Sequence, residues 1–402
     1  MHGAATLVVL GVLLLSPLPT AEATQGTQGL QDGWAVGDQG QVTGGQLLSD
    51  EVADMQQAGA GWVRVNFRLG QCFTNWTSVG CNGQTALQTY DQVLATIQAR
   101  NLKVLGLLSS EAWPGQQSDW TANNVEHTAG GTGNNPYIQA FAQSAASVLA
   151  SHYDGTNGPL VSQWEVWNEP NAWASSPSTG VYTGSSFVYP SNFAQILSQA
   201  WTAIKHASGT AVVVAGGLLG LDSSGTHKGA HNGYKAKAGG GSCPSTVPSG
   251  GDYLCSTYSM GWQYGGWTKG AGPFDAVGQH MYINQGTTTS TGAIQKYLND
   301  LRKVYTTYGG DPSSKQTHVT EFGWSTGSVS PSVQAHNLQT AYQAFKGNQL
   351  RRAWLLISHA GSRGHWRLLR TGGHQRQSGA VVRDLPAVYH LLKLRLHLLV
   401  LR

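Results

Sequence analysis

The chain has 402 residues, of which 11% are charged, and its formal net charge is +4 at pH 7. This length is enough to bury a large core and exceeds the roughly 250 residues of a (β/α)8 barrel. The positive charge is confined to the end of the chain. Residues 349–402 hold 10 of the 24 Lys and Arg side chains and one acidic residue, so residues 1–348 carry a net charge of −5. This distribution argues against nucleic acid as a partner.

The N-terminus has the pattern of a secretory signal peptide. An apolar run over residues 7–15 precedes Ala21-Glu22-Ala23, which predicts a signal peptide over residues 1–23, cleaved after Ala23. The run is too short to span a bilayer, and no other segment has 18 consecutive apolar residues. We therefore expect a secreted protein with no membrane anchor.

From residue 32 to 348, short apolar strands alternate with amphipathic helices. The pattern predicts strands at 34–37, 62–67, 102–108, 161–167, 210–216, 274–281 and 317–322, and helices at 47–58, 87–99, 136–152, 191–207, 294–308 and 333–345. Seven such repeats favour an α/β fold with a parallel sheet, closed as a single (β/α)8 TIM barrel over residues 32–348. Residues 351–357 are the candidate for the eighth strand.

Long loops and four cysteines interrupt this alternation. Residues 109–135 are polar and residues 221–272 are rich in Gly, and loops of such length without regular structure are usually functional. The cysteines form two local pairs, Cys72 with Cys81 and Cys243 with Cys255. In an exported chain this even number favours two disulfides, each closing a short loop.

The composition changes abruptly beyond Asn348. Residues 358–402 form an atypical basic tail, in which residues 358–378 lack acidic side chains and the last residues alternate Leu with cations. A reading-frame shift in the source gene near Asn348 is one interpretation, and a genuine basic amphipathic tail is the other. Resequencing the locus distinguishes them, because a frame shift requires that a one-base change restores the frame.

Two of the predicted strands end in a glutamate. Glu169 lies in the motif Asn-Glu-Pro (168–170) and Glu321 in the motif Thr-Glu-Phe-Gly (320–323). Pro170 cannot donate to a strand ladder, so the fourth strand stops there. The carboxyl ends of parallel strands form the working face of a barrel. Two glutamates at that face are what retaining glycoside hydrolysis needs, when their carboxyl groups lie about 5–5.5 Å apart.

These two motifs, in this order and spacing, resemble the signature of the clan A retaining glycoside hydrolases. The nearest in appearance are the cellulase-type enzymes of glycoside hydrolase family 5 and the related family 39. The resemblance covers roughly residues 32–348. It implies a barrel that hydrolyses β-glycosidic bonds with retention of configuration, with Glu169 as the acid/base and Glu321 as the nucleophile.

Other polar residues at the strand ends are candidate substrate-binding residues. Asn168 is placed to hydrogen-bond the sugar 2-hydroxyl. A nucleophile must stay ionised, and Arg64 at the end of the second strand is the cation expected beside Glu321. His280 and Tyr282 flank the end of the sixth strand, where clan members often have a residue that contacts the nucleophile or the substrate.

Tryptophans near strand ends complete the candidate site, because indole rings stack on sugar faces. Of these, Trp324 and Trp354 are predicted to bind substrate. Glu165 competes with Glu169 for the acid/base role, but four residues earlier on a strand it points to the same face about 13 Å deeper. Glu111, in the loop after the third strand, is a weaker competitor.

The sequence contains no metal-binding signature, and hydrolysis by two carboxylates needs no cofactor. We expect a monomer that acts on a β-linked polysaccharide or oligosaccharide. The sugar, and the choice between endo and exo cleavage, stay open. The alternatives are a transglycosylase and a non-catalytic carbohydrate-binding protein on an inactivated barrel.

Overall fold

The structure is a computed structural model. It describes residues 29–31, 35–36, 42–43, 49–113, 120, 123–125, 136–172, 186–220 and 251–347, with short gaps at 50–51, 54, 58, 81–82, 157, 285 and 325–326. The predicted signal peptide (1–23), the candidate eighth strand (351–357) with Trp354, and the basic tail (358–402) all lie outside these residues.

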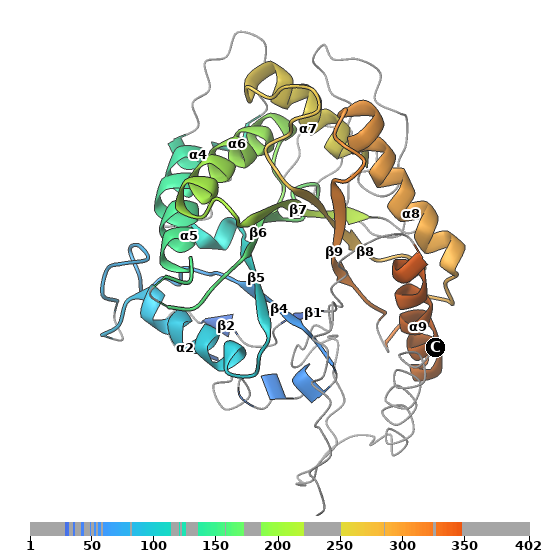
Figure 1. Cartoon of the computed structure of the whole chain (residues 1–402), viewed down its shortest axis with the longest axis horizontal. Helices are drawn as coiled ribbons and strands as arrows, with labels where there is room; N and C mark the ends of the chain where they lie inside the picture. The colour runs from blue at the N-terminus through green and yellow to red at the C-terminus, as the bar shows by residue number, and fades with distance from the viewer. Residues whose placement is uncertain are drawn as a thin grey trace, which may run out of the picture.

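Seven strands in the described part of the chain form one curled parallel sheet (Figure 1). Their order in the sheet is their order in the sequence, and every neighbouring pair is parallel. The strands are β1 (Gly29–Gln31), β4 (Trp62–Asn66), β5 (Lys103–Leu108), β6 (Gln163–Asn168), β7 (Val212–Gly220), β8 (Ala276–Met281) and β9 (Gln316–Phe322). This is the α/β alternation of a TIM barrel, with the eighth strand still a prediction.

Helices connect the strands and lie around the outside of the sheet (Figure 1). The α-helices are α2 (Ala86–Gln98), α4 (Pro136–Phe141), α5 (Val148–His152), α6 (Pro190–Ala207), α7 (Gly251–Tyr264), α8 (Thr291–Lys303) and α9 (Pro331–Gly347). Two π-helical segments continue neighbouring helices, at Ala142–Ser147 and Val304–Tyr308, and a 3-10 turn at Ser110–Ala112 follows β5.

The two faces of the sheet differ in what they bury. On β4, Val63 and Val65 belong to the large apolar cluster packed under the helices. Trp62 and Arg64 alternate with them and therefore point to the concave face. Trp62 lies in a small second cluster of buried residues with Leu105, Val214 and Ala276. Polar side chains occupy the same concave face nearer the carboxyl ends of the strands, so the interior becomes more polar toward that edge.

The prediction of the first strand was wrong. Residues 34–37 do not join the parallel sheet: Ala35–Val36 (β2) pairs antiparallel with Val42–Thr43 (β3), and the sheet begins instead at Gly29–Gln31. Only five residues separate β2 from β3, so antiparallel pairing needs no crossover connection. The residues of β1 carry too little apolar pattern to be recognised as a strand.

The long Gly-rich segment also contains a helix that the sequence did not predict. Residues 251–264 of this segment form α7, whereas residues 221–250 lie outside the described part. Tyr253 is fully buried and its hydroxyl donates to the carbonyl of Val188 at 2.6 Å. At Gly261 a Cβ atom would stand 2.2 Å from Trp267, so the glycine lets that indole pack against the helix. Tertiary packing outweighs the weak helix propensity of the segment.

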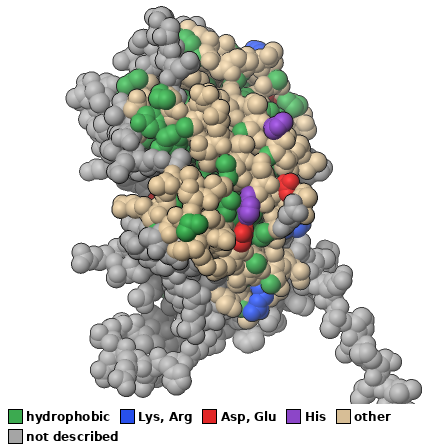
Figure 2. All heavy atoms as spheres, turned by 90° about the vertical axis from the view of Figure 1, so that its left-hand side faces the viewer, with side chains coloured by type: hydrophobic (Ala, Val, Ile, Leu, Met, Phe, Trp, Pro, Cys, Tyr) green, Lys and Arg blue, Asp and Glu red, His purple; other side chains and the backbone are tan. Residues whose placement is uncertain are grey.

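The surface agrees with the composition. The face shown in Figure 2 carries few charged side chains, scattered among uncharged ones. Among the described helices, none is long and apolar enough to cross a membrane. Cys72 and Cys255 are both disulfide-bonded. Cys81 and Cys243 lie outside the described residues, so the predicted pairing stays a prediction.

Candidate active site

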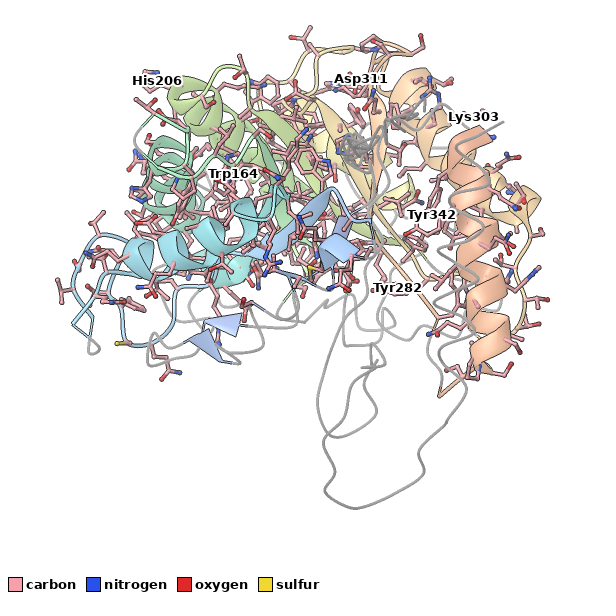
Figure 3. All side chains as sticks on the ribbon, turned by 60° about the horizontal axis from the view of Figure 1, so that its bottom comes forward. Trp164, His206, Tyr282, Lys303, Asp311 and Tyr342 are labelled. Carbon is pink, nitrogen blue, oxygen red and sulfur yellow. The ribbon has the colours of Figure 1, made fainter. Side chains whose placement is uncertain are left out.

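The carboxyl ends of four strands bring the predicted polar residues together. Arg64 comes from β4, Glu169 directly follows β6, His280 comes from β8 and Glu321 from β9. Tyr282 follows β8 and lies at the end of the sheet opposite to Asp311, which precedes β9 (Figure 3). Parallel strands place their carboxyl ends at one edge, which is why residues up to 257 positions apart meet here.

The two predicted catalytic glutamates lie side by side. One carboxylate oxygen of each, together with a ring nitrogen of His280, fall within 4.8 Å of one another. His280 lies between them, with Nδ1 2.8 Å from Oε1 of Glu169 and 3.4 Å from Oε2 of Glu321. The side chains of Glu169 and Glu321 are 22% and 11% exposed, so both can be reached from the carboxyl edge of the sheet. This separation fits the spacing required for double displacement.

Donors converge on the carboxylate of Glu321. Nη1 of Arg64 lies 2.6 Å from Oε1, and the hydroxyl of Tyr282 donates to Oε2 at 2.6 Å. Burial alone raises the pKa of Glu321, but the charges of His280 and Arg64 and the hydrogen bonds from Tyr282 and Arg64 outweigh it and lower that pKa. Glu321 is therefore held as the anion, which is the form that a nucleophile requires.

Arg64 contacts three partners with three different nitrogen atoms. Besides Glu321, its Nε lies 2.6 Å from Oε2 of Glu165 and its Nη2 donates to Oδ1 of Asn168 at 2.9 Å. The side chain is 2% exposed. Burial lowers the pKa of Arg64, yet Glu165 and Glu321 more than reverse this effect, so the guanidinium stays protonated.

His280 is fully buried and occupies space that a glycine leaves open. A Cβ atom at Gly217 on β7 would stand 1.9 Å from Nε2 of the imidazole. Burial opposes the protonation of His280, but Glu321 and Glu169 outweigh it and raise its pKa. The role of Gly217 could not be recognised from the sequence, because glycines are common throughout this chain.

The backbone around Glu169 is unusual. Trp167 and Glu169 have positive φ angles of 77° and 47°, which L-residues seldom adopt. The amide of Glu169 donates to the carbonyl of Gly217 at 3.1 Å and thereby holds this conformation. Backbone strain of this kind is concentrated at functional sites.

Other predicted residues lie elsewhere. Trp324 is 1% exposed and its indole donates to the carbonyl of Ile283 at 2.9 Å, so it is part of the packed core and does not present a ring face to a sugar. Glu111 does not join the two glutamates. Its carboxylate accepts from the Asn66 amide at 2.7 Å and lies 3.4 Å from the Arg68 guanidinium.

The cluster of Glu169, His280 and Glu321 also has the spacing of a metal-binding group. The guanidinium of Arg64 already contacts Glu321 at 2.6 Å, and the two glutamates raise the pKa of His280, which favours the protonated ring over the neutral ring that a metal needs. We therefore assign no metal to these residues.

Comparisons with known proteins support the fold. No protein-family profile matches the chain, and no curated protein is similar to it in sequence. Its fold is similar to that of a family 39 glycoside hydrolase from Bacteroides cellulosilyticus WH2, with a TM-score of 0.51 and 14% identity over 84% of this chain and 57% of that one. This chain thus spans less than two thirds of that enzyme.

Two endo-β-1,4-mannanase structures from Thermotoga petrophila are similar as well. For one, from strain RKU-1, the TM-score is 0.51 with 12% identity over 91% of this chain and 99% of that one. For the other, the TM-score is 0.52 with 12% identity over 91% and 76% of the two chains. The fold of the chain is thus similar to the folds of these three glycoside hydrolase structures.

Proposed function

We propose that the protein is a secreted retaining glycoside hydrolase that cleaves β-linked polysaccharides or oligosaccharides. The observation that carries this proposal is the pair of glutamates at the carboxyl edge of the sheet, whose carboxylate oxygens lie within 4.8 Å on either side of His280. That spacing is shorter than the roughly 6.5–9.5 Å of inverting enzymes and supports direct attack by a carboxylate.

The surroundings of the two carboxylates fit a double displacement. Glu321, held ionised by Arg64, attacks the anomeric carbon while Glu169 gives a proton to the departing glycosidic oxygen. A glycosyl-enzyme ester forms and the first product leaves. Glu169 then takes a proton from water, which breaks the ester and releases the sugar with its original configuration. Asn168, fixed by Arg64, is placed to bind the 2-hydroxyl.

The substrate class is part of this proposal. We propose β-1,4-mannan, glucan, xylan and galactan as the substrates to test, and the two mannanase structures of similar fold support including mannan. We also propose that the protein is exported through the predicted signal peptide, acts as a monomer, and carries the disulfides Cys72–Cys81 and Cys243–Cys255. Trp354 of the candidate eighth strand is proposed to stack on the sugar.

The decisive experiment is hydrolysis of these polysaccharides and of 4-nitrophenyl β-glycosides, with the anomer of the first product followed by proton NMR. We expect a β product, loss of at least about 10³-fold in kcat for Glu321→Gln, and loss for Glu169→Gln that is largest with poor leaving groups. Glu111→Gln removes a carboxylate outside the cluster and serves as the matched control. An α product, or full activity of Glu321→Gln, contradicts the proposal.

The same assay separates the two alternatives. Longer oligosaccharides as the main product indicate a transglycosylase. Binding to a polysaccharide without hydrolysis indicates a carbohydrate-binding protein.

A further inference from the structure

A third carboxylate lies beneath the catalytic pair. Glu165, three residues before the end of β6 and four before Glu169, is fully buried. Its Oε2 lies 2.6 Å from Nε of Arg64, and its Oε1 accepts from the hydroxyl of Thr320 at 2.7 Å. A buried carboxylate is costly unless it is paired and hydrogen-bonded, and here it is both.

We propose that Glu165 is a positioning residue of the site: it fixes the Arg64 guanidinium and takes up part of its charge, so that Glu321 stays ionised and yet remains nucleophilic. This inference rests on the proposed glycosidase function. Glu165 is placed below the reacting atoms and has no exposed surface through which to touch a substrate.

The shape of the guanidinium supports this role. Its donors lie in one plane with a fixed geometry, so anchoring one edge orients the others. Nε is anchored by Glu165, which leaves Nη1 for Glu321 and Nη2 for Asn168. Without Glu165, Glu321 would be the carboxylate that pairs with the guanidinium of Arg64. The negative charge of Glu321, which must attack the sugar, would then be more strongly neutralised.

The charges around Glu321 support it as well. Arg64 faces Glu321 from β4 and Glu165 lies behind that arginine on β6, while Glu169, His280 and Tyr282 face it from the ends of β6 and β8. Arg64 is shared between the carboxylates of Glu165 and Glu321. Replacing Glu165 by a neutral side chain leaves Glu321 as the carboxylate that pairs with this cation, which makes Glu321 easier to ionise and less reactive.

The glycines next to Glu165 indicate that its place is closely defined. A Cβ atom at Gly278 would stand 3.1 Å from Oε1 of Glu165 and 2.1 Å from the carbonyl oxygen of Gly216. On its other side, Oε1 lies 3.9 Å from Nε2 of His280, beyond hydrogen-bond distance. The hydrogen bonds of Glu165 thus connect it to Arg64 and Thr320.

The test is Glu165→Gln, which keeps the shape of the side chain and an acceptor for Arg64 but removes the charge. On 4-nitrophenyl β-glycosides we expect the acidic limb of the kcat/KM profile to move down by roughly one pH unit. We expect kcat to fall by about tenfold and KM to stay within about twofold, because Glu165 does not touch the substrate. Asp300→Asn removes one negative charge from a surface ion pair and is the matched control, with an unchanged profile.

An unchanged acidic limb and kcat in folded Glu165→Gln would overturn the proposal. If that variant fails to fold, Thr320→Val tests the same idea with the opposite sign. Without the hydroxyl of Thr320, the carboxylate of Glu165 interacts more strongly with Arg64. Arg64 then stabilises the Glu321 anion less, so the acidic limb moves up by a few tenths of a pH unit. No shift in that variant also overturns the proposal.

A titration independent of activity separates this proposal from the proposed function. The side-chain carboxyl carbon of Glu321, followed by NMR with ¹³C-labelled glutamate and assigned with Glu321→Gln, titrates at lower pH in Glu165→Gln than in the unmodified protein. This shift is expected even if no glycoside is hydrolysed. Its absence in a folded, active protein rejects the role of Glu165 alone.

Discussion

Replacing Gly217 by alanine tests whether the imidazole of His280 must stay where it is. The new Cβ atom would stand 1.9 Å from Nε2, 2.4 Å from Cδ2 and 2.7 Å from Cε1 of the ring, whereas ordinary contacts begin at 3.4 Å. The backbone of Gly217 does not have the positive φ that only glycine tolerates, so the effect of the substitution is steric. The ring must therefore move by about 1.5 Å, and because it is fully buried, it moves against its neighbours.

Such a shift breaks the contact of 2.8 Å between His280 and Glu169. We expect Gly217→Ala to lose about 10²-fold in kcat, since a displacement of about 1 Å has that effect in positioned sites. Overpacking should lower the free energy of unfolding by about 1–3 kcal/mol, measured by denaturant titration. In a His280→Ala background the alanine should have almost no further effect on stability, because the clashing ring is gone.

Gly292→Ala on α8 is the control. A Cβ atom there meets nothing within 4 Å, so activity should be unchanged and stability equal or slightly higher. If Gly217→Ala keeps its activity within about twofold of the unmodified protein, the imidazole is not held by this contact and the reasoning fails.

Two further predictions concern pH. Tyr282→Phe removes the hydroxyl that donates to Oε2 of Glu321 at 2.6 Å, so the pKa of Glu321 rises. We expect the acidic limb of the kcat/KM profile to move to higher pH and kcat to fall by about tenfold. An acidic limb that stays in place contradicts this assignment. The pKa of His280 is raised in the folded state despite its burial, mainly by Glu321 and Glu169. Its contribution to stability is therefore complete below the unfolded pKa of about 6.5 and is lost as the pH rises through the folded pKa. Tm scans should fall less steeply above about pH 6.5 in His280→Gln, and an equal slope in both proteins would show that His280 is not charged in the native state.

The strands were predicted well where a buried apolar run ends in polar residues. In a parallel sheet buried on both faces such runs are long enough to recognise, as at 102–108 and 317–322, and the two Glu motifs then located the edge that carries the candidate site. The strand at 29–31 and the helix at 251–264 could not be predicted, because pairing with β4 and packing on α6 decide them rather than local sequence.

Individual side chains were harder to place than strands. Trp324 follows a strand end, as a sugar-stacking residue would, yet its ring is buried in the core. The sequence does not show toward which side of the chain an isolated aromatic side chain points. Glu165 was predicted about 13 Å below Glu169, which was wrong, because both carboxylates lie beside the His280 ring, at 3.9 and 2.8 Å from its two nitrogens. Its pairing with Arg64 depends on the register between strands 101 residues apart. Gly217 matters only through the ring that lies next to it.

The strand order of the sheet is also the order in which a ribosome makes the strands. Arg64 is synthesised first among the charged residues of the site, and Glu165 follows 101 residues later, whereas Glu321 comes 257 residues after the arginine. During synthesis, Glu165, the buried partner of Arg64, is thus present long before Glu321 is added. The carboxylate of Glu321 is the last of these groups to be added, and it joins the earlier pair of Arg64 and Glu165 as a third member.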